Sequence, residues 1–227
     1  MKMPRETPVM TLPNATLFPQ ALLPLYIFEP RYRQMLSDAL HSNRMFAVAM
    51  QKPGNAREMP LPVAGLGLVR VSVGHRDGTS HLILQGIARV ELEETLRCKP
   101  YRIHRIKTLR TPPCDSVAAD ALLAKVRELL EERIKLGLPF PFPVMPASPA
   151  KEENAPSPPF SAKEILGYLD SIEDPEQAAD LVSCAVLPDA AERQTILETI
   201  EVETRLRRLI QFLLAEIRKR RKSDGHE

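Results

Sequence analysis

The sequence predicts an α+β protein in which a β-rich first half is followed by a helical second half. Two observations carry this prediction. Apolar residues recur with a two-residue period in several short runs up to residue 109, which is typical of strands. After residue 114 they recur mostly at helical spacing. Because only one short helical segment interrupts the first half, we expect its strands to form an antiparallel, barrel-like sheet.

The β-rich half contains about six expected strands and one helix. The run ALLPLYIF (21–28) alternates between two faces, and Pro24 predicts a sheet edge because proline cannot donate to a ladder. The segment EPRYRQMLSDAL (29–40) changes to helical spacing, with Pro30 in the first turn. Asp77-Gly78 lies between two apolar runs and is a strong hairpin signal. Further strands are expected at 44–50, 65–74, 81–92 and 99–109.

The helical half is predicted to be a bundle of about four helices that ends in a long one. A first helix at 120–134 is followed by a connection (138–160) that holds eight of the chain's 22 prolines. Proline excludes regular helix and ladder there, so we expect an extended connection. Capping residues predict helix starts at Ser161, Asp174 and Asp189, the last helix running without a break to residue 222. The expected domains are therefore 1–112 and 113–227.

Composition and charge exclude several classes of protein. At 227 residues the chain can bury a substantial core, and its formal net charge of +2 provides no large field for nucleic acid. It has no run of 18 apolar residues, and its first ten residues hold no long apolar run, so we expect neither a membrane span nor a signal peptide. Three widely spaced cysteines favour reduced thiols in a cytoplasmic protein over disulfides or a zinc site.

The sequence shows no motif for catalysis, a metal or a cofactor. The five histidines (41, 75, 81, 104 and 226) lack the HExxH or paired spacing of metal sites. His75 and His81 flank a turn and could approach each other across a hairpin, but two imidazoles alone would make a poor site, and turn and surface positions are the simpler interpretation. No Gly-x-Ser-x-Gly elbow occurs. We therefore expect a protein that is not an enzyme and has no cofactor or metal.

Three blocks of the sequence resemble the N-terminal domain of Lon proteases. In the first, LPNATLFPQALLPLYIFEPRYRQML (12–36), a leucine-proline strand leads through a phenylalanine-proline step to a second strand and a helix. In the second, LILQGIARVEL (82–92), Gly86 precedes Arg89 by three residues on an apolar strand. The third (174–217) has an Asp-Pro opening and a Leu-Pro break before a helix. Together the blocks extend the resemblance to roughly residues 7–220.

The resemblance implies both a fold and a role. The implied fold is a PUA-like pseudo-barrel followed by a helical bundle, with Gly86 and Arg89 as structural signature residues. The implied role is the recognition of unfolded or damaged polypeptides. A complete Lon protease also needs a P-loop and an Asp-Gly-Pro-Ser-Ala-Gly motif. This chain has no Gly-Lys dipeptide, and its nearest match to the second motif, DGTS (77–80), lacks the proline. The sequence thus resembles the recognition domain standing alone.

Two apolar stretches are candidate protein-binding sites. In the first, Phe18, Pro24, Tyr26 and Phe28 lie either under the short helix or in an open apolar patch, and such patches usually mark interaction sites. The second stretch is proline-rich, and it either folds back on the sheet or offers an apolar strip to a partner. Its candidate residues are Phe140, Phe142 and Met145.

The leading hypothesis is a non-catalytic protein-binding module that binds apolar segments of unfolded polypeptides or acts as an adaptor to a partner protease. The alternative is RNA binding through the basic region 89–110, since a pseudo-barrel with clustered positive charge also fits RNA. The sequence leaves open whether the protein forms a homo-oligomer through its long last helix, and it offers no feature that implies a membrane partner.

Overall fold

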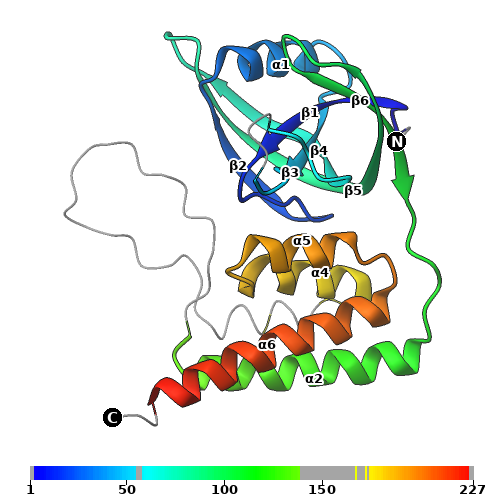
Figure 1. Cartoon of the computed structure of the whole chain (residues 1–227), viewed down its shortest axis with the longest axis vertical. Coiled ribbons are helices and arrows are strands. Elements are labelled where there is room, and N and C mark those ends of the chain that lie inside the picture. The colour runs from blue at the N-terminus through cyan, green and yellow to red at the C-terminus, as the bar shows by residue number, and fades with distance from the viewer. Residues whose placement is uncertain (1–2, 55–57, 139–166, 168–171, 173, 225–227) are drawn as a thin grey trace. The chain divides into compact units, whose positions relative to one another are not determined.

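The structure is a computed structural model, and it describes residues 3–54, 58–138, 167, 172 and 174–224 (Figure 1). The chain folds into two compact units. One is formed by Met1–Thr111 together with Asp189–Ile200, and the other by Pro112–Pro188 together with Glu201–Glu227. A short stretch of the helical half thus belongs with the strands. The expected domain boundary after residue 112 stays a prediction.

The first unit is built around a six-stranded sheet, which confirms the predicted number of strands. A helix between the second and third strands confirms the predicted change from two-residue to helical periodicity. The elements of this unit are β1 (Glu6–Leu12), β2 (Leu22–Ile27), α1 (Pro30–Leu40), β3 (Met45–Met50), β4 (Val63–Gly74), β5 (Ser80–Arg97), β6 (Arg102–Leu109) and α5 (Ala190–Glu198).

The strands follow the order β2-β5-β4-β3-β1-β6, and β5 additionally pairs with β6. The long strand β5 makes this possible because its residues 80–85 pair with β2, whereas its residues 89–97 pair with β6. Among the described residues β2 pairs only with β5, so the other edge of β2 carries no strand. This agrees with the edge position that Pro24 predicts.

The prediction of a purely antiparallel sheet is wrong at one pair of strands. β1 and β3 run parallel, with Val9 opposite Ala47 and Leu12 opposite Met50. Parallel neighbours need a crossover connection, and the segment between β1 and β3, which includes β2 and α1, provides one. Helix α1 is therefore part of the crossover connection. The sheet is mixed because it contains this parallel pair beside antiparallel pairs.

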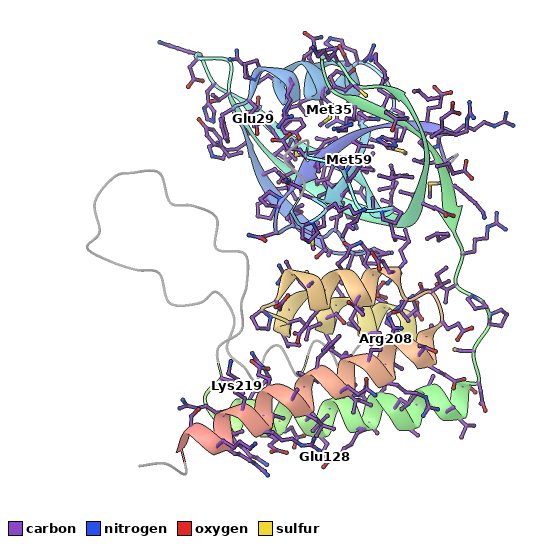
Figure 2. The ribbon with its side chains drawn as sticks, viewed as in Figure 1. Glu29, Met35, Met59, Glu128, Arg208 and Lys219 are labelled. Atoms are coloured by element: carbon purple, nitrogen blue, oxygen red, sulfur yellow. The ribbon has the colours of Figure 1, made fainter. Side chains whose placement is uncertain are left out.

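Helix α1 covers one apolar cluster of the sheet. Proline at its first position suits the start of a helix because the missing N–H would be unpaired there anyway. The buried face of α1 carries Tyr32, Met35, Leu36 and Ala39, at the spacing that the sequence predicts. Met35, labelled in Figure 2, is completely buried in this cluster.

Strand β3 is buried on both faces and joins two apolar clusters. Phe46 and Val48 belong to the cluster under α1. Ala47 and Ala49 point the other way, into a second cluster with Leu66. The alternation of side chains along a strand explains this division.

The second unit contains α2 (Ser116–Lys135), α4 (Pro175–Val186) and α6 (Val202–Asp224). The side chains of Asp115 and Asp174 cap the first two of these helices, because each accepts a hydrogen bond from a backbone N–H of the first turn. The helix expected to start at Ser161 lies outside the described residues. The other helices of this half confirm the predicted helical periodicity.

The prediction of an unbroken last helix is wrong. The helix that starts after Asp189 ends at Glu198, where Thr199 takes an extended conformation (φ −83°, ψ 108°), and α6 begins at Val202. The hydroxyl of Thr199 donates to the carbonyl of Thr195 at 2.6 Å. Threonine side chains compete for backbone groups in this way and favour a helix end. The break also separates α5, which belongs to the first unit, from α6 in the second.

Two buried arginines tie the helices of the second unit together. Arg133 of α2 donates from Nε to Oε2 of Glu216 on α6 at 2.8 Å, and from Nη2 to Oε1 of the same carboxylate at 3.1 Å. Arg205 of α6 pairs with the buried Asp180 of α4 at 2.9 Å. Bidentate and charge-assisted hydrogen bonds of this kind fix the orientation of both partners. These arginines connect three helices across the interior of the unit.

Candidate functional site

The first unit exposes a row of apolar side chains on the outer face of β2, β5 and β4. Strand register places them side by side. Pro24 lies opposite Ile83, and Ile83 lies opposite Val71. In the next row on the same face, Tyr26 lies opposite His81, which in turn lies opposite Val73. Three neighbouring strands thus contribute to one surface.

Most of these side chains are open to solvent. The exposed fractions are 56% for Leu22, 42% for Tyr26, 58% for Phe28, 51% for Val71 and 55% for Val73. Large apolar side chains exposed singly are ordinary, whereas a contiguous group usually marks an interaction site. We call this group the outer patch. Its residues are Leu22, Pro24, Tyr26, Phe28, Val71, Val73 and Ile83.

The aromatic part of the outer patch is organised by ring contacts. Tyr26 stacks on Phe28 with ring centroids 5.8 Å apart, and on His81 with centroids 4.7 Å apart. Offset stacking of this kind stabilises aromatic pairs and restricts their rotamers. The patch therefore presents a partly ordered aromatic surface to solvent.

A β-bulge explains why β4 contributes to the outer patch. Val69 is buried opposite Leu84, and the register shifts between Val69 and Val71. A bulge adds one residue to one strand, here Arg70, and so reverses the face on which the following side chains lie. Without it, Val71 and Val73 would share the buried face of Val69. The strand alternation visible in the sequence does not reveal this change.

Four candidate binding residues come from the first apolar stretch. The structure places three of them together on the surface and buries the fourth. Pro24, Tyr26 and Phe28 all belong to the outer patch. Phe18 is completely buried, so it cannot contribute to a surface. Its backbone crosses β5, where Gly86 N–H donates to the carbonyl of Ala21 at 2.9 Å. The candidates Phe140, Phe142 and Met145 lie outside the described residues.

Gly86 and Arg89 both lie at close contacts between segments of the first unit. A Cβ atom at Gly86 would lie only 1.9 Å from the carbonyl oxygen of Phe18, so the close crossing of the chain there requires glycine. Arg89 is buried, and its Nε donates to the carbonyl of Leu197 in α5 at 3.2 Å. Gln194 of α5 also donates to the carbonyl of Val63 at 2.9 Å. These contacts fix α5 to the strands.

Ion pairs and ring contacts engage several basic residues of the region 89–110. Arg105 pairs with Glu94 at 2.6 Å, and Lys107 lies 3.9 Å from Glu91. The guanidinium of Arg97 lies 4.9 Å from the ring centroid of Tyr101. Neighbouring acidic side chains reduce the local positive field that an RNA phosphate would meet.

Charged residues also fix the end of β2 to the loop that follows β3. Arg31 of α1 pairs with Glu29 at 2.8 Å and with Glu58 at 2.5 Å. The hydrogen bond from Arg31 lowers the pKa of Glu58, and the same bond raises the pKa of Arg31. Glu29, labelled in Figure 2, precedes α1 and directly follows Phe28 of the outer patch. These pairs therefore hold one end of the patch in place.

The described residues contain no group of three or more His, Cys, Asp and Glu side chains that is arranged to hold a metal ion. Within the same residues, no helix combines the length and the apolar character needed to cross a membrane. The outer patch is therefore the candidate site that we carry forward.

Comparison with known proteins identifies the family. The family model of the ATP-dependent protease La (LON) substrate-binding domain matches residues 6–215. The chain belongs to this family. The match confirms the resemblance in the three sequence blocks, and the matched family is a substrate-binding region rather than a peptidase domain.

Curated relatives are similar over nearly the whole chain. The Lon protease of Dictyoglomus thermophilum is 24% identical over 94% of this chain, and that of Anaeromyxobacter dehalogenans is 26% identical over 92%. The chain spans 25% and 23% of the lengths of these two relatives. It thus corresponds to about a quarter of each protease.

Solved structures share the fold. The N-terminal domain of the Mycobacterium avium complex Lon protease superposes with a TM-score of 0.68 at 17% identity, covering 92% of this chain and 97% of that one. A Lon N-terminal domain protein from Xanthomonas campestris gives a TM-score of 0.54 at 17% identity, covering 91% and 98%. Both structures agree with the α+β fold.

Proposed function

We propose that this protein is a non-catalytic recognition module that binds apolar segments of unfolded polypeptides through the outer patch. Membership of a substrate-binding family supports binding to polypeptides. The observation that carries the proposal is the outer patch itself, where five large apolar side chains of β2, the residue after it and β4 lie exposed on either side of β5. Pro24, Tyr26 and Phe28 are binding residues in this proposal, and we add Leu22, Val71, Val73 and Ile83 because they belong to the same patch.

The energetics of the patch favour weak and reversible binding. Burial of apolar surface contributes about 25 cal/mol per Å², so a contact of a few hundred Å² supplies only several kcal/mol before association costs. We therefore expect dissociation constants of about micromolar or weaker for a single segment. Weak binding suits a module that must release many different clients.

The edge of β2 offers a second means of binding beside the patch. A client segment in extended conformation can pair with the backbone groups of an open sheet edge, while its side chains contact the neighbouring face. Here the edge of β2 and the outer patch are continuous, because Leu22, Pro24 and Tyr26 belong to both. Main-chain pairing would add affinity without demanding a particular client sequence.

A binding assay with a matched control tests the proposal. The probe is a fluorescently labelled, reduced and alkylated protein that cannot fold, and anisotropy reports its binding to the whole chain. We expect Tyr26→Ser combined with Phe28→Ser to weaken binding by roughly tenfold, since the two rings supply a large share of the apolar area. Val73→Ser should weaken it less.

Val117→Ser is the matched control for Val73→Ser. Val117 is exposed by 75%, and it lies in the second unit, away from the outer patch in the sequence. Its substitution removes an exposed valine without touching the patch, so binding should stay unchanged. Equal losses in Val117→Ser and Val73→Ser would show that general surface hydrophobicity, and not the outer patch, holds the client.

The salt dependence of binding distinguishes this proposal from RNA binding. Apolar contacts change little between low and physiological salt, whereas binding to phosphates weakens steeply. The same titration should therefore be run with the unfolded protein and with a structured RNA at two salt concentrations. Tight RNA binding that is lost at physiological salt, together with no client binding, would replace our proposal by the RNA alternative.

We also propose that the sheet is the PUA-like pseudo-barrel that the family resemblance implies. The pairing of β5 with β6 supports it, because this pairing joins the last strand of the sheet order back to the second. Amide contacts between Val90 and Thr108 in solution would test this closure directly, since these residues lie opposite each other in that pair.

Adaptor action for a partner protease is a further part of the proposal, which co-purification with a protease would test.

A further inference from the structure

Two histidines meet at the end of the β4–β5 hairpin, next to the outer patch. His75 Nε2 lies 2.8 Å from His81 Nδ1. The ring planes are nearly perpendicular, at 86°, with centroids 5.0 Å apart. His75 is exposed and His81 is partly exposed, so solvent reaches the pair.

The backbone holds the two imidazoles on one face of a tight hairpin. Val73 pairs with His81, and His75 N–H donates to the carbonyl of Thr79 at 2.8 Å, so His75 and His81 are diagonal neighbours. Gly78 closes the turn with φ +81°. The carboxylate of Asp77 accepts hydrogen bonds from the N–H and the hydroxyl of Thr79, at 2.9 and 2.7 Å, which fixes the turn. The positions of both Cβ atoms are therefore set by the fold.

The separation of the two ring nitrogens matches one coordination geometry. Imidazole nitrogens bind first-row metals at about 2.0–2.1 Å, so two of them at a right angle lie about 2.9 Å apart, whereas a tetrahedral angle separates them by about 3.4 Å. The observed 2.8 Å is the length of a hydrogen bond between the rings and also lies near the right-angle value, so a metal ion can replace the hydrogen bond without moving the nitrogens apart. Right-angle coordination by nitrogen and oxygen is typical of the tetragonal sites of Cu²⁺ and Ni²⁺.

We propose that His75 and His81 form a two-imidazole binding site for Cu²⁺ or Ni²⁺, with water in the remaining positions. The hydrogen bond between the rings shows that one nitrogen accepts where the other donates. A metal ion bound by both nitrogens displaces the proton between them, which the donating ring takes up at its other nitrogen by exchange with water. Each ring also turns by about 45°, so that its lone pair points at the ion instead of along the line that joins the two nitrogens. The broad terminal torsion of histidine allows these rotations, and on the His81 side they require the stacked Tyr26 ring to shift with the imidazole. The proposal concerns these two residues only and does not rest on client binding.

Titration of the whole untagged chain with NiCl₂ tests the site. Ni²⁺ is preferred as the probe because Cu²⁺ oxidises thiols and the chain has three cysteines. We expect one Ni²⁺ per chain in calorimetry. His75→Ala and His81→Ala should each weaken binding roughly a hundredfold, since the second imidazole acts as an intramolecular ligand at high effective concentration.

His41→Ala is the control for histidine content. His41 is exposed at the end of α1 and lies in another part of the first unit's sequence, so its removal should leave the affinity for Ni²⁺ unchanged. Circular dichroism checks that each variant stays folded. A His75→Ala/His81→Ala double variant that keeps the affinity of the natural protein would overturn the proposal.

The paramagnetism of Ni²⁺ gives a second readout that locates the ion. The ring signals of His75 and His81 should broaden first in NMR spectra, followed by those of Tyr26, whose ring centroid lies 4.7 Å from that of His81. Broadening that begins at cysteine or at His41 signals instead would place the ion elsewhere, and the proposed site would be wrong.

Discussion

The contiguous group of exposed apolar side chains lies in the first unit of this protein, whereas the buried ion pairs between helices lie in the second. The first unit leaves Leu22, Tyr26, Phe28, Val71 and Val73 open to solvent on the outer face of its sheet. In the second unit two arginines, Arg133 and Arg205, are buried among the helices. Exposing apolar side chains to water costs free energy. Burying charged side chains does so as well, because the charges lose their hydration.

The difference lies in what compensates each arrangement. Each buried arginine meets a carboxylate within the second unit, so its cost is balanced by structure. Among the described residues of the first unit, Tyr26 of the outer patch stacks on Phe28 and on His81, and the five exposed side chains stay open to solvent. Internal ion pairs therefore account for the buried arginines, whereas for the exposed apolar side chains of the patch we propose binding to another molecule.

The largest effect is expected when the compensation of a buried charge is removed. Arg205→Ala leaves the buried carboxylate of Asp180 without its guanidinium, and breaking such a pair costs about 3–5 kcal/mol in the free energy of unfolding. Chemical denaturation followed by circular dichroism measures this loss.

Arg207→Ala is the matched control on the same helix. Arg207 is exposed and lies 3.6 Å from Glu203, an arrangement worth less than about 1 kcal/mol. If Arg205→Ala and Arg207→Ala lower the free energy of unfolding by the same amount, the buried ion pair contributes no more than the surface pair, and our interpretation is wrong.

A smaller loss is expected when the chain crossing in the first unit is disturbed. Gly86→Ala places a Cβ atom 1.9 Å from the carbonyl oxygen of Phe18, and overpacking of this kind costs about 1–3 kcal/mol. Gly74→Ala is the control, because its nearest neighbour would be the Ser80 hydroxyl at 3.9 Å. Thermal unfolding of both variants compares them, and an unchanged midpoint for Gly86→Ala would contradict the role of this glycine.

Acidification is expected to destabilise the first unit through His104. Burial, together with the charge of Arg102, lowers the pKa of His104 in the folded state. The unfolded chain therefore binds a proton at a higher pH than the folded chain, so stability is present above the ordinary histidine pKa and decreases as the pH falls below about 6.5. His104→Gln should flatten this slope between about pH 7 and pH 5, as measured by chemical denaturation.

His41→Gln, at an exposed position, is the control for the loss of a histidine in the pH experiment. If His104→Gln leaves the slope unchanged, another group accounts for it.

The smallest effect on stability is expected in the outer patch. Phe28→Ser removes an exposed ring and should change the free energy of unfolding by no more than about 0.5 kcal/mol. Phe46→Ala, in which a completely buried ring is lost, should cost about 3–5 kcal/mol. A large loss in Phe28→Ser, measured in the same denaturation assay, would show that the patch serves internal stability after all.

The local elements of the fold could be predicted from the sequence because local patterns determine them. The change from two-residue to helical spacing after Phe28 predicted the step from β2 to α1, and Asp77-Gly78 predicted the hairpin. The parallel pairing of β1 with β3 was not predicted, because it depends on a crossover that joins distant segments. The end of α5 at Thr199 was missed because Ile196, Leu197 and Ile200 continue the apolar spacing across it.

The candidate site could be predicted only in part. Pro24, Tyr26 and Phe28 follow from simple alternation along β2, whereas Val71 and Val73 reach the same surface only through a bulge at Arg70. Phe18 was misplaced because its burial results from the crossing of its backbone over Gly86. The buried roles of Arg133 and Arg205 were missed as well, since an arginine on a helix gives no signal of its distant partner.

Pro24 at the centre of the open strand edge has a consequence for the protein at high concentration. An open edge beside an apolar face invites copies of the same chain to polymerise edge to edge. Proline has no N–H, so a strand that joins β2 meets an interruption in the middle of a six-residue edge. Main-chain pairing is therefore confined to short stretches on either side. Growth of long assemblies is therefore discouraged, whereas a single short client segment, as we propose, can still bind and dissociate quickly.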